Sequence, residues 1–209
     1  MAAIDNDIEK YLDIYKDSFN RKKKPRLPKQ LNSMEDTYAR LSALYILAVK
    51  SGNHDCRLDD NTTSRIQQVA SWLHESPKHG LILRGTLGNG KTTMLKAVST
   101  MLEYGVVRVN AKAVYDAFKK TEMPEYFSGT LLFLDDLGAE PERCNIYGVD
   151  YHPLSDIILY RYDNNLTTVI ATNLSFDEIR SRYGDRVYDR LIEMYDAIEY
   201  DAPSYRGIV

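Results

Sequence analysis

Apolar residues recur along the chain with two different periods, and these periods divide it into strands and helices. Four short runs are rich in apolar or β-branched residues, which is typical of the strands of a parallel sheet. They cover residues 81–84, 106–110, 131–134 and 167–171. Helical spacing over residues 91–104, 111–120 and 153–164 predicts one helix in each interval between them. This alternation predicts an α/β fold whose parallel sheet has right-handed crossovers and helices on both faces.

Three amphipathic helices are predicted before the sheet begins. The first covers residues 4–19, and its apolar stripe consists of Ile8, Tyr11, Leu12, Tyr15 and Phe19. The second covers residues 36–50, where Tyr38, Leu41, Leu44, Tyr45 and Ala48 share one face. The third begins at Thr62 and ends near Ser76, with Ile66, Val69, Ala70 and Leu73 inward. The first helix either packs on its own domain or docks a partner, and the second belongs to the core or to an interface.

Two polar stretches separate these helices and suggest the domain organisation. Residues 21–30, RKKKPRLPKQ, hold six cations and two prolines, a composition incompatible with a regular helix. They form either a solvated linker or a contact for a phosphate backbone. Residues 51–61 are predicted to be a loop. We therefore expect a small helical accessory segment over 1–50, which includes the basic linker and docks a partner, followed by the main domain over 62–209.

Composition limits the class of protein. A chain of 209 residues can bury one sizeable core, and its net charge of −3 predicts no general affinity for polyanions. Residues 1–50 hold ten Lys and Arg against seven Asp and Glu, whereas the rest holds 17 against 23, so any nucleic-acid contact should favour the amino-terminal part. Cys56 and Cys144 lack Cys or His neighbours at metal-ligand spacing, which argues against a zinc site and gives no support for a disulfide framework.

The amino terminus MAAIDNDIEKYLD carries acids and helix formers where a secretory signal would carry an apolar core. No apolar run in the sequence approaches the length of a transmembrane helix. We therefore expect a cytoplasmic location without membrane contact.

The segment LILRGTLGNGKTT, residues 81–93, carries the strongest chemical signal. It fits the phosphate-binding pattern G-x-x-x-x-G-K-[ST] between a predicted strand and a predicted helix. Glycines let backbone N–H groups approach a phosphate chain, Lys91 supplies a charge for the β and γ phosphates, and Thr92 supplies a hydroxyl ligand for Mg²⁺. The expected nucleotide contacts are Gly85, Thr86, Gly88, Asn89, Gly90, Lys91, Thr92 and Thr93. A nucleotide triphosphate with Mg²⁺ is the predicted ligand.

Polar residues at two other strand ends supply candidate catalytic groups. Asp135 and Asp136 follow the apolar run 131–134, and Asn173 follows the run 167–171. Ligands of open parallel sheets bind at the carboxyl ends of the strands. We expect Asp135 to join the Mg²⁺ shell and Asp136 to orient the attacking water. The Asn173 amide would hydrogen-bond the γ phosphate and that water.

A basic cluster completes the candidate chemistry. Five arginines follow the last predicted strand, at Arg180, Arg182, Arg186, Arg190 and Arg206. A guanidinium group can stabilise the charge that develops on a transferred phosphoryl group, and it can come from a neighbouring subunit. The sequence alone leaves open, for each of them, whether it is only a solvated helix residue.

With these signals in place, the chain from about residue 62 to 209 resembles the AAA+ ATPases of the DnaC/DnaI helicase-loader and IstB transposition-helper group. The likeness is carried by GTLGNGKTT, LLFLDDLGAEP, TTVIATNLSFDEI, RYGDRVYDRL and the terminal SYR. It implies a three-layer AAA+ sandwich that binds ATP and Mg²⁺. Asp135 and Asp136 then serve the metal and hydrolysis, and Asn173 is sensor 1. Arg190 is implied to be an arginine finger acting across a subunit boundary, and Arg206 to be sensor 2.

The resemblance implies a slow, assembly-dependent ATPase switch in DNA replication that loads a replicative helicase. It also implies a homo-oligomer when ATP is bound, and it allows contact with single-stranded DNA. A transposition helper, with a transposase as its partner, shares the same ATPase core. A nucleotide-gated scaffold with little turnover is the alternative from another class. A small-molecule kinase is disfavoured by the short terminal basic cluster, and a GTPase by the absence of an N-K-x-D segment.

Overall fold

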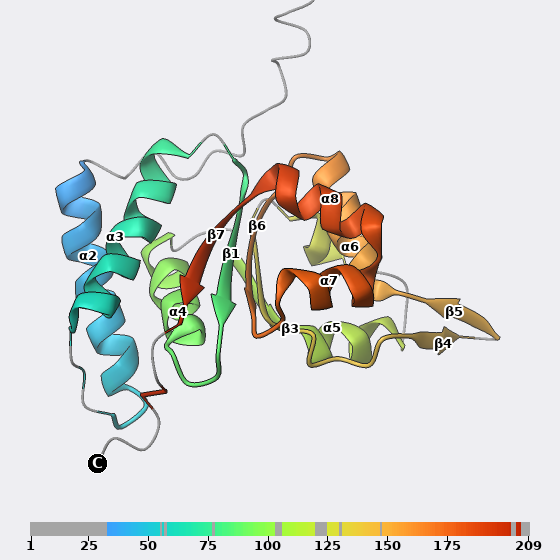
Figure 1. Cartoon of the computed structure of the whole chain (residues 1–209), viewed down its shortest axis with the longest axis horizontal. Helices are drawn as coiled ribbons and strands as arrows, with labels where there is room; N and C mark the ends of the chain where they lie inside the picture. The colour runs from blue at the N-terminus through green and yellow to red at the C-terminus, as the bar shows by residue number, and fades with distance from the viewer. Residues whose placement is uncertain are drawn as a thin grey trace, which may run out of the picture.

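A five-stranded parallel sheet with the order β2-β3-β6-β1-β7 forms the centre of the protein (Figure 1). The strands are β1 (Gly80–Gly85), β2 (Val106–Asn110), β3 (Leu131–Leu137), β6 (Thr167–Thr172) and β7 (Tyr195–Tyr200). The computed structural model describes residues 33–54, 56, 58–76, 78–102, 106–119, 125–129, 131–146, 148–201 and 204–205. The α/β fold that the alternating pattern predicts is confirmed.

Helices cover both faces of the sheet and give the molecule three layers (Figure 1). One outer layer contains α2 (Met34–Lys50), α3 (Asp60–Glu75) and α4 (Lys91–Leu102). The other contains α5 (Ala111–Phe118), α6 (Pro153–Asp163), α7 (Phe176–Tyr183) and α8 (Asp185–Met194). A 3₁₀ turn, η1 (Glu125–Ser128), precedes β3.

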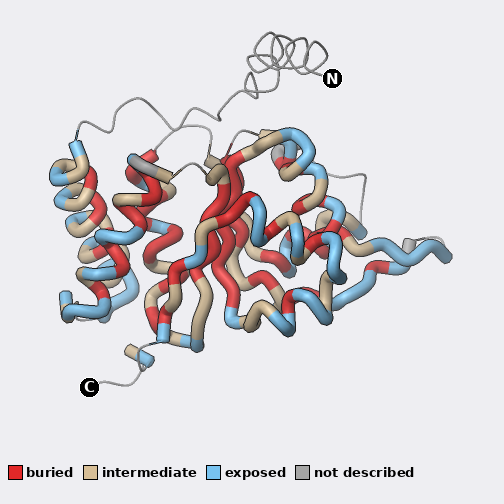
Figure 2. Tube along the Cα trace, turned by 45° about the horizontal axis from the view of Figure 1, so that its top comes forward, coloured by how far each residue is buried: buried red, intermediate tan, exposed pale blue. Residues whose placement is uncertain are grey.

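Each face of the sheet has its own hydrophobic core. Side chains of a strand alternate between faces, so Leu81 and Leu83 pack under α2, α3 and α4, while Ile82 packs with the opposite layer. Val169 and Ile170 divide in the same way on β6. Because both faces are covered, β6 is buried along its whole length, and β1 and β3 are buried except near their carboxyl ends (Figure 2). This explains why their sequences read as unbroken apolar runs.

Helix α2 shares its core with the sheet, which differs from the accessory segment expected over residues 1–50. Leu41 is fully buried and Tyr45 is 5% exposed, and both belong to the same apolar cluster as Leu83 and Leu95. Residues 34–50 therefore pack as part of the main domain. The predicted helix 4–19 and the basic segment 21–30 lie outside the described residues.

Two β-structures of the chain have no counterpart among the predicted strands. Strand β7 has the sequence YDAIEY, whose acids hide the strand pattern although Tyr195, Ile198 and Tyr200 are buried. Strands β4 (Cys144–Ile146) and β5 (Val149–Tyr151) pair antiparallel in a hairpin that projects from the body of the protein (Figure 1). Their three-residue length is too short for a recognisable period.

Among the helices that the structure describes, none combines the length and the apolar character needed to cross a bilayer.

The packing of α2 can be tested by a pair of leucine substitutions on that helix. Leu41→Ala should lower the free energy of unfolding by about 2–5 kcal/mol, because it leaves a cavity in the shared core. Leu47→Ala is the matched control, since Leu47 is 61% exposed, and it should change stability by less than about 0.5 kcal/mol. Urea denaturation measures both. Equal stability of the two variants would show that α2 does not share the core.

Candidate functional site

The predicted phosphate loop connects β1 to α4 and has the backbone conformation that its glycines permit. Gly85, Gly88 and Gly90 all have positive φ angles, at 144°, 82° and 86°. A Cβ at Gly85 would overlap the backbone carbonyl of Tyr200, and a Cβ at Gly90 would overlap the Tyr45 hydroxyl. Glycine is therefore required at both positions by close neighbours as well as by conformation.

Asn89 holds this loop in place through hydrogen bonds of its buried side chain. Its side chain is 1% exposed, and its Nδ2 donates to Thr86 Oγ1 at 2.7 Å and to the Tyr200 carbonyl at 2.5 Å. The Arg65 guanidinium stacks on the Tyr200 ring at 4.4 Å and lies 3.4 Å from the Asn89 carbonyl. Strand β7 and helix α3 thus support the loop. We expected Asn89 among the nucleotide contacts, and in the structure its side-chain amide donates hydrogen bonds to groups of the protein itself.

The Lys91 ammonium lies inside the loop. Its Nζ donates to the carbonyl oxygens of Gly85 at 2.8 Å and of Thr86 at 2.6 Å. The side chain is nearly buried, and α4 begins at the same residue. A charged lysine at a helix N-terminus, surrounded by inward peptide groups, suits a polyanion such as a phosphate chain.

Thr92 and Asp135 meet across two elements and offer a fitting pair of Mg²⁺ ligands. Thr92 Oγ1 donates to Asp135 Oδ1 at 3.1 Å. Burial, followed by the nearby charge of Asp136, raises the pKa of the Asp135 carboxyl. Hard oxygen donors next to a phosphate cradle suit Mg²⁺, and a divalent cation would favour the ionised carboxylate.

Asp136 has an unusual backbone conformation. Its φ is 54°, although it is not a glycine, and the pairing of β3 with β6 shifts register between Leu134 and Leu137. Its Oδ2 accepts a hydrogen bond from Asn110 Nδ2 at 3.2 Å. Positive φ at a non-glycine residue is uncommon and is concentrated at functional sites. A β-bulge changes the direction of the side chains beside it. Asp135 and Asp136 can therefore occupy different positions, as a metal ligand and a water-orienting group require.

A cavity of about 730 Å³ opens beside these groups. Its volume is in the range of small-molecule sites. The predicted site residues that line it are Gly88, Asn89, Gly90, Lys91, Thr92, Thr93, Asp136 and the exposed Asn173. Gly85, Thr86 and Asp135 are not among the lining residues. Hence the loop, one acid and the strand-end amide converge on one space.

The other wall of the cavity was not foreseen from the sequence. It is formed by the end of α2 and by the following loop, including Tyr45, Val49, His54 and Cys56. Burial raises the pKa of the Tyr45 phenol to about 12, so the phenol stays neutral. A partly apolar wall opposite a phosphate loop suits a nucleobase. Helical spacing marked Tyr45 only as a core or interface residue.

Tyr205 brings the far end of the chain to the same cavity. Its backbone N–H donates to the Gly88 carbonyl at 3.1 Å, and its hydroxyl donates to Asp59 Oδ2 at 2.8 Å. Asp59 is the N-cap of α3, where its side chain accepts from the Thr62 N–H at 2.7 Å. No local signal marks this contact, because Gly88 and Tyr205 are distant in sequence.

The predicted arginines are not brought together. Arg190 lies on α8, where its guanidinium stacks on the Tyr162 ring at 4.5 Å and bonds Glu193 Oε2 at 3.1 Å. Arg180 pairs with Asp185, Arg186 is exposed, and Arg182 contacts Glu140. Arg206 lies outside the described residues. The described lining of the cavity contains two lysines, Lys91 and Lys96, and no arginine.

Comparisons with known proteins agree with this fold. No protein-family model matches the sequence, and no curated protein does. The chain is similar to the crystal structure of DnaI, with 23% identity and a TM-score of 0.57 over 84% of this chain and 95% of that chain. It is also similar to AMPPCP-bound DnaA from Aquifex aeolicus, with 20% identity and a TM-score of 0.51 over 69% of this chain.

A further similar structure is the replication initiator DnaA bound to AMPPCP and single-stranded DNA, with 17% identity and a TM-score of 0.52 over 70% of this chain. The matches cover 48% of each DnaA chain, so this chain spans about half their length. Identities this low show the fold. That fold is a three-layer α/β sandwich with a parallel sheet, the arrangement that the resemblance of the motifs implies.

Removal of the Thr92 hydroxyl tests the predicted metal ligands. Thr92→Val keeps the shape of the side chain but loses the oxygen, so the gain in ATP affinity on adding Mg²⁺ should fall at least about tenfold. Thr100→Val is the control, because Thr100 lies on the same helix and its hydroxyl bonds only the Lys96 carbonyl among the described contacts. Calorimetry with and without a chelator measures the gain. An unchanged gain in Thr92→Val would exclude Thr92 as a ligand.

Proposed function

We propose that the protein is an ATP-binding and ATP-hydrolysing switch of the DnaC/DnaI helicase-loader type. The observation that carries this proposal is that Lys91, Thr92 and Asp136 line one cavity, and that Thr92 is hydrogen-bonded to Asp135. Lys91 and Thr92 follow β1 in the phosphate loop, and the two acids lie near the carboxyl end of β3, which β6 separates from β1 in the sheet. A loop that holds phosphates beside a carboxylate suits hydrolysis of the terminal phosphoanhydride bond.

Each residue has a role that follows from its position. The loop N–H groups and Lys91 bind the β and γ phosphates, and Thr92 with Asp135 would hold Mg²⁺. When bound, the ion neutralises charge that develops on the phosphoryl group. Asp136, bonded to Asn110, would orient a water in line with the γ phosphate, and Asn173 would bond the same phosphate. Release of the cleaved phosphate would then change the site from its ATP-bound state to its ADP-bound state.

Arg190 is proposed to act on the cavity of a neighbouring copy. It lies on α8, outside the lining of its own cavity, and its side chain is 39% exposed. An arginine supplied in trans makes turnover depend on assembly, because the charge on the phosphoryl group is stabilised only at a subunit boundary. Arg206 stays a predicted sensor of the γ phosphate.

The proposed partner is a replicative helicase at single-stranded DNA. The similarity to DnaI over 84% of this chain supports this role, and so does the similarity to a DnaA bound to single-stranded DNA. Because α2 packs in the main domain, the proposed docking segment is the part that precedes it, residues 1–32. A cytoplasmic location is proposed with this role.

Two alanine substitutions separate binding from catalysis. Lys91→Ala should abolish ATP binding, because the phosphates lose their fixed positive charge. Arg190→Ala should keep the affinity for ATP but lower kcat by about 10³-fold or more. Arg180→Ala is the matched control, since Arg180 is an exposed arginine paired only with Asp185 in the described ion pairs. Phosphate release and nucleotide titration measure both quantities.

The dependence of turnover on protein concentration distinguishes the proposed switch from a scaffold. Turnover per subunit that rises with concentration in the wild type supports hydrolysis at a subunit boundary. Tight ATP binding with undetectable turnover would favour a nucleotide-gated scaffold. Normal turnover in Arg190→Ala would refute its role as the trans arginine.

Affinity capture tests the proposed partner. The full chain, loaded with a slowly hydrolysed ATP analogue, should retain a replicative helicase from its source cells, identified by mass spectrometry. A truncated chain that begins at Ser33 should lose the helicase but keep its ATP affinity. Capture of a transposase would move the function to transposition while leaving the proposed ATPase chemistry intact.

A further inference from the structure

Glu140 is a buried carboxylate in the turn that follows the catalytic acids. Its side chain is 2% exposed, and it lies four residues after Asp136 in the same connection. Burial of a carboxylate costs free energy unless hydrogen bonds and opposite charges compensate it. The hydrogen-bond and ion-pair partners of Glu140 must therefore compensate its burial.

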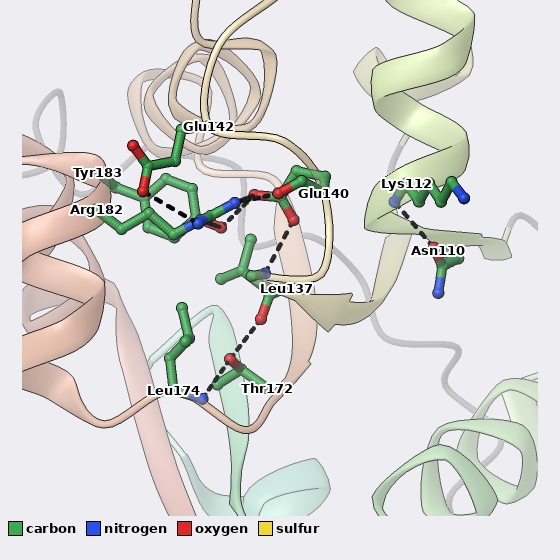
Figure 3. A network of polar contacts seen from close by, with 10 residues as sticks. Asn110, Lys112, Leu137, Glu140, Glu142, Thr172, Leu174, Arg182 and Tyr183 are labelled. Carbon is green, nitrogen blue, oxygen red and sulfur yellow. Dashed lines mark hydrogen bonds and ion pairs between the residues drawn. The ribbon is translucent and has the colours of Figure 1, made fainter.

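Three donors converge on Glu140 from two segments (Figure 3). The Gly138 N–H donates to Oε2 at 2.9 Å, and the Tyr183 hydroxyl donates to Oε1 at 2.5 Å. The Arg182 guanidinium lies 3.5 Å from Oε1 and also donates to the backbone carbonyl of Glu140. Burial, followed by the charge of Glu140, raises the pKa of the Tyr183 phenol, which keeps this donor protonated. The turn is thereby attached to the end of α7.

Thr172 fixes the other side of the same turn (Figure 3). Its Oγ1 donates to the Leu137 carbonyl at 2.7 Å and accepts from the Leu174 N–H at 3.1 Å. Thr172 directly precedes Asn173, so the end of β6 is joined to the end of β3. Gly138 has a φ of 103° and packs against Leu174, where a Cβ would lie 2.6 Å from a methyl carbon.

These contacts surround Asp136, a proposed catalytic residue with a strained backbone. A non-glycine residue at a φ of 54°, as in Asp136, is strained and persists only when its surroundings enforce it. Its carbonyl accepts from the Ala139 N–H at 3.0 Å, so the turn that holds Glu140 begins at Asp136 itself. Loosening this turn would let Asp136 relax and would displace its carboxylate.

We propose that Glu140, held by Tyr183 and Arg182, is a positioning residue that keeps the Asp136 carboxylate directed at the attacking water. This assignment rests on the proposed hydrolysis of ATP at Asp136. The assignment predicts that nucleotide binding and hydrolysis depend differently on Glu140. The phosphate loop belongs to a different strand, β1, so nucleotide binding should not depend on Glu140, whereas the hydrolytic step should.

Removal of one hydroxyl tests this assignment with little disturbance of packing. Tyr183→Phe should lower kcat about tenfold or more, because small displacements of a catalytic group have large effects on rate. The Kd for a slowly hydrolysed ATP analogue should stay within about twofold of the wild type. Glu140→Gln should lower kcat at least as much, and the double variant should be no slower than Glu140→Gln, because the two residues act as one unit. Tyr38→Phe on α2 is the control and should match the wild type.

Amide hydrogen exchange provides a readout that does not require turnover. In Tyr183→Phe, exchange at residues 136–140 should become faster, while exchange at residues 85–91 should not change. A general loss of stability would accelerate both segments and lower the melting temperature, and that result would overturn the assignment.

The remaining outcomes separate this inference from the proposed function. If the wild type hydrolyses ATP and Tyr183→Phe has the same kcat, the positioning role is wrong and the ATPase proposal stands. If the wild type shows no turnover, the ATPase proposal fails, and with it the hydrolytic role of Glu140. Faster exchange confined to residues 136–140 would then still show that Glu140 fixes this turn.

Discussion

Parallel pairing of β3, β6 and β1 is the constraint on which the rest of the site depends. In a parallel sheet all strands end at the same edge, so groups that follow different strands lie together without being neighbours in sequence. The register places Leu134 beside Ile170, and Ile170 beside Ile82. The phosphate loop, the acids and Asn173 follow from these strands. Helices on both faces exclude water from the strands and hold them in place. The distances between the phosphate loop, the acids and Asn173 are therefore fixed by the sheet.

The sequence was sufficient to predict the parts of the fold that are specified locally. Apolar and β-branched runs identified β1, β3 and β6, because burial on both faces leaves few polar positions. The edge strand β2 is only partly buried, and its β-rich sequence marked it despite Arg108. The pattern ending in Gly90, Lys91 and Thr92 located the phosphate loop, since few other residues allow close approach of a backbone to phosphates. Thr92 and Asp135 were each predicted as Mg²⁺ ligands, and in the structure the Thr92 hydroxyl donates to the Asp135 carboxylate.

Other parts of the site depend on contacts between distant segments, and no local pattern specifies them. Strand β7 is recognisable only once it pairs with β1, where Tyr200 supports Asn89. Tyr205 reaches the cavity because its N–H meets the Gly88 carbonyl. The bulge at Asp136 was also unpredictable, because aspartate prefers negative φ and only the surrounding turn enforces the other conformation.

A crystal structure with Mg²⁺ and a slowly hydrolysed ATP analogue tests the central claim most directly. The account predicts that the β and γ phosphates lie in the loop of residues 85–92, within hydrogen-bond distance of Lys91 Nζ. It predicts one Mg²⁺ ion near Thr92 Oγ1 and Asp135, and the base against the wall that includes Tyr45. A nucleotide bound elsewhere, or phosphates in the loop with the base turned away from that wall, would contradict it.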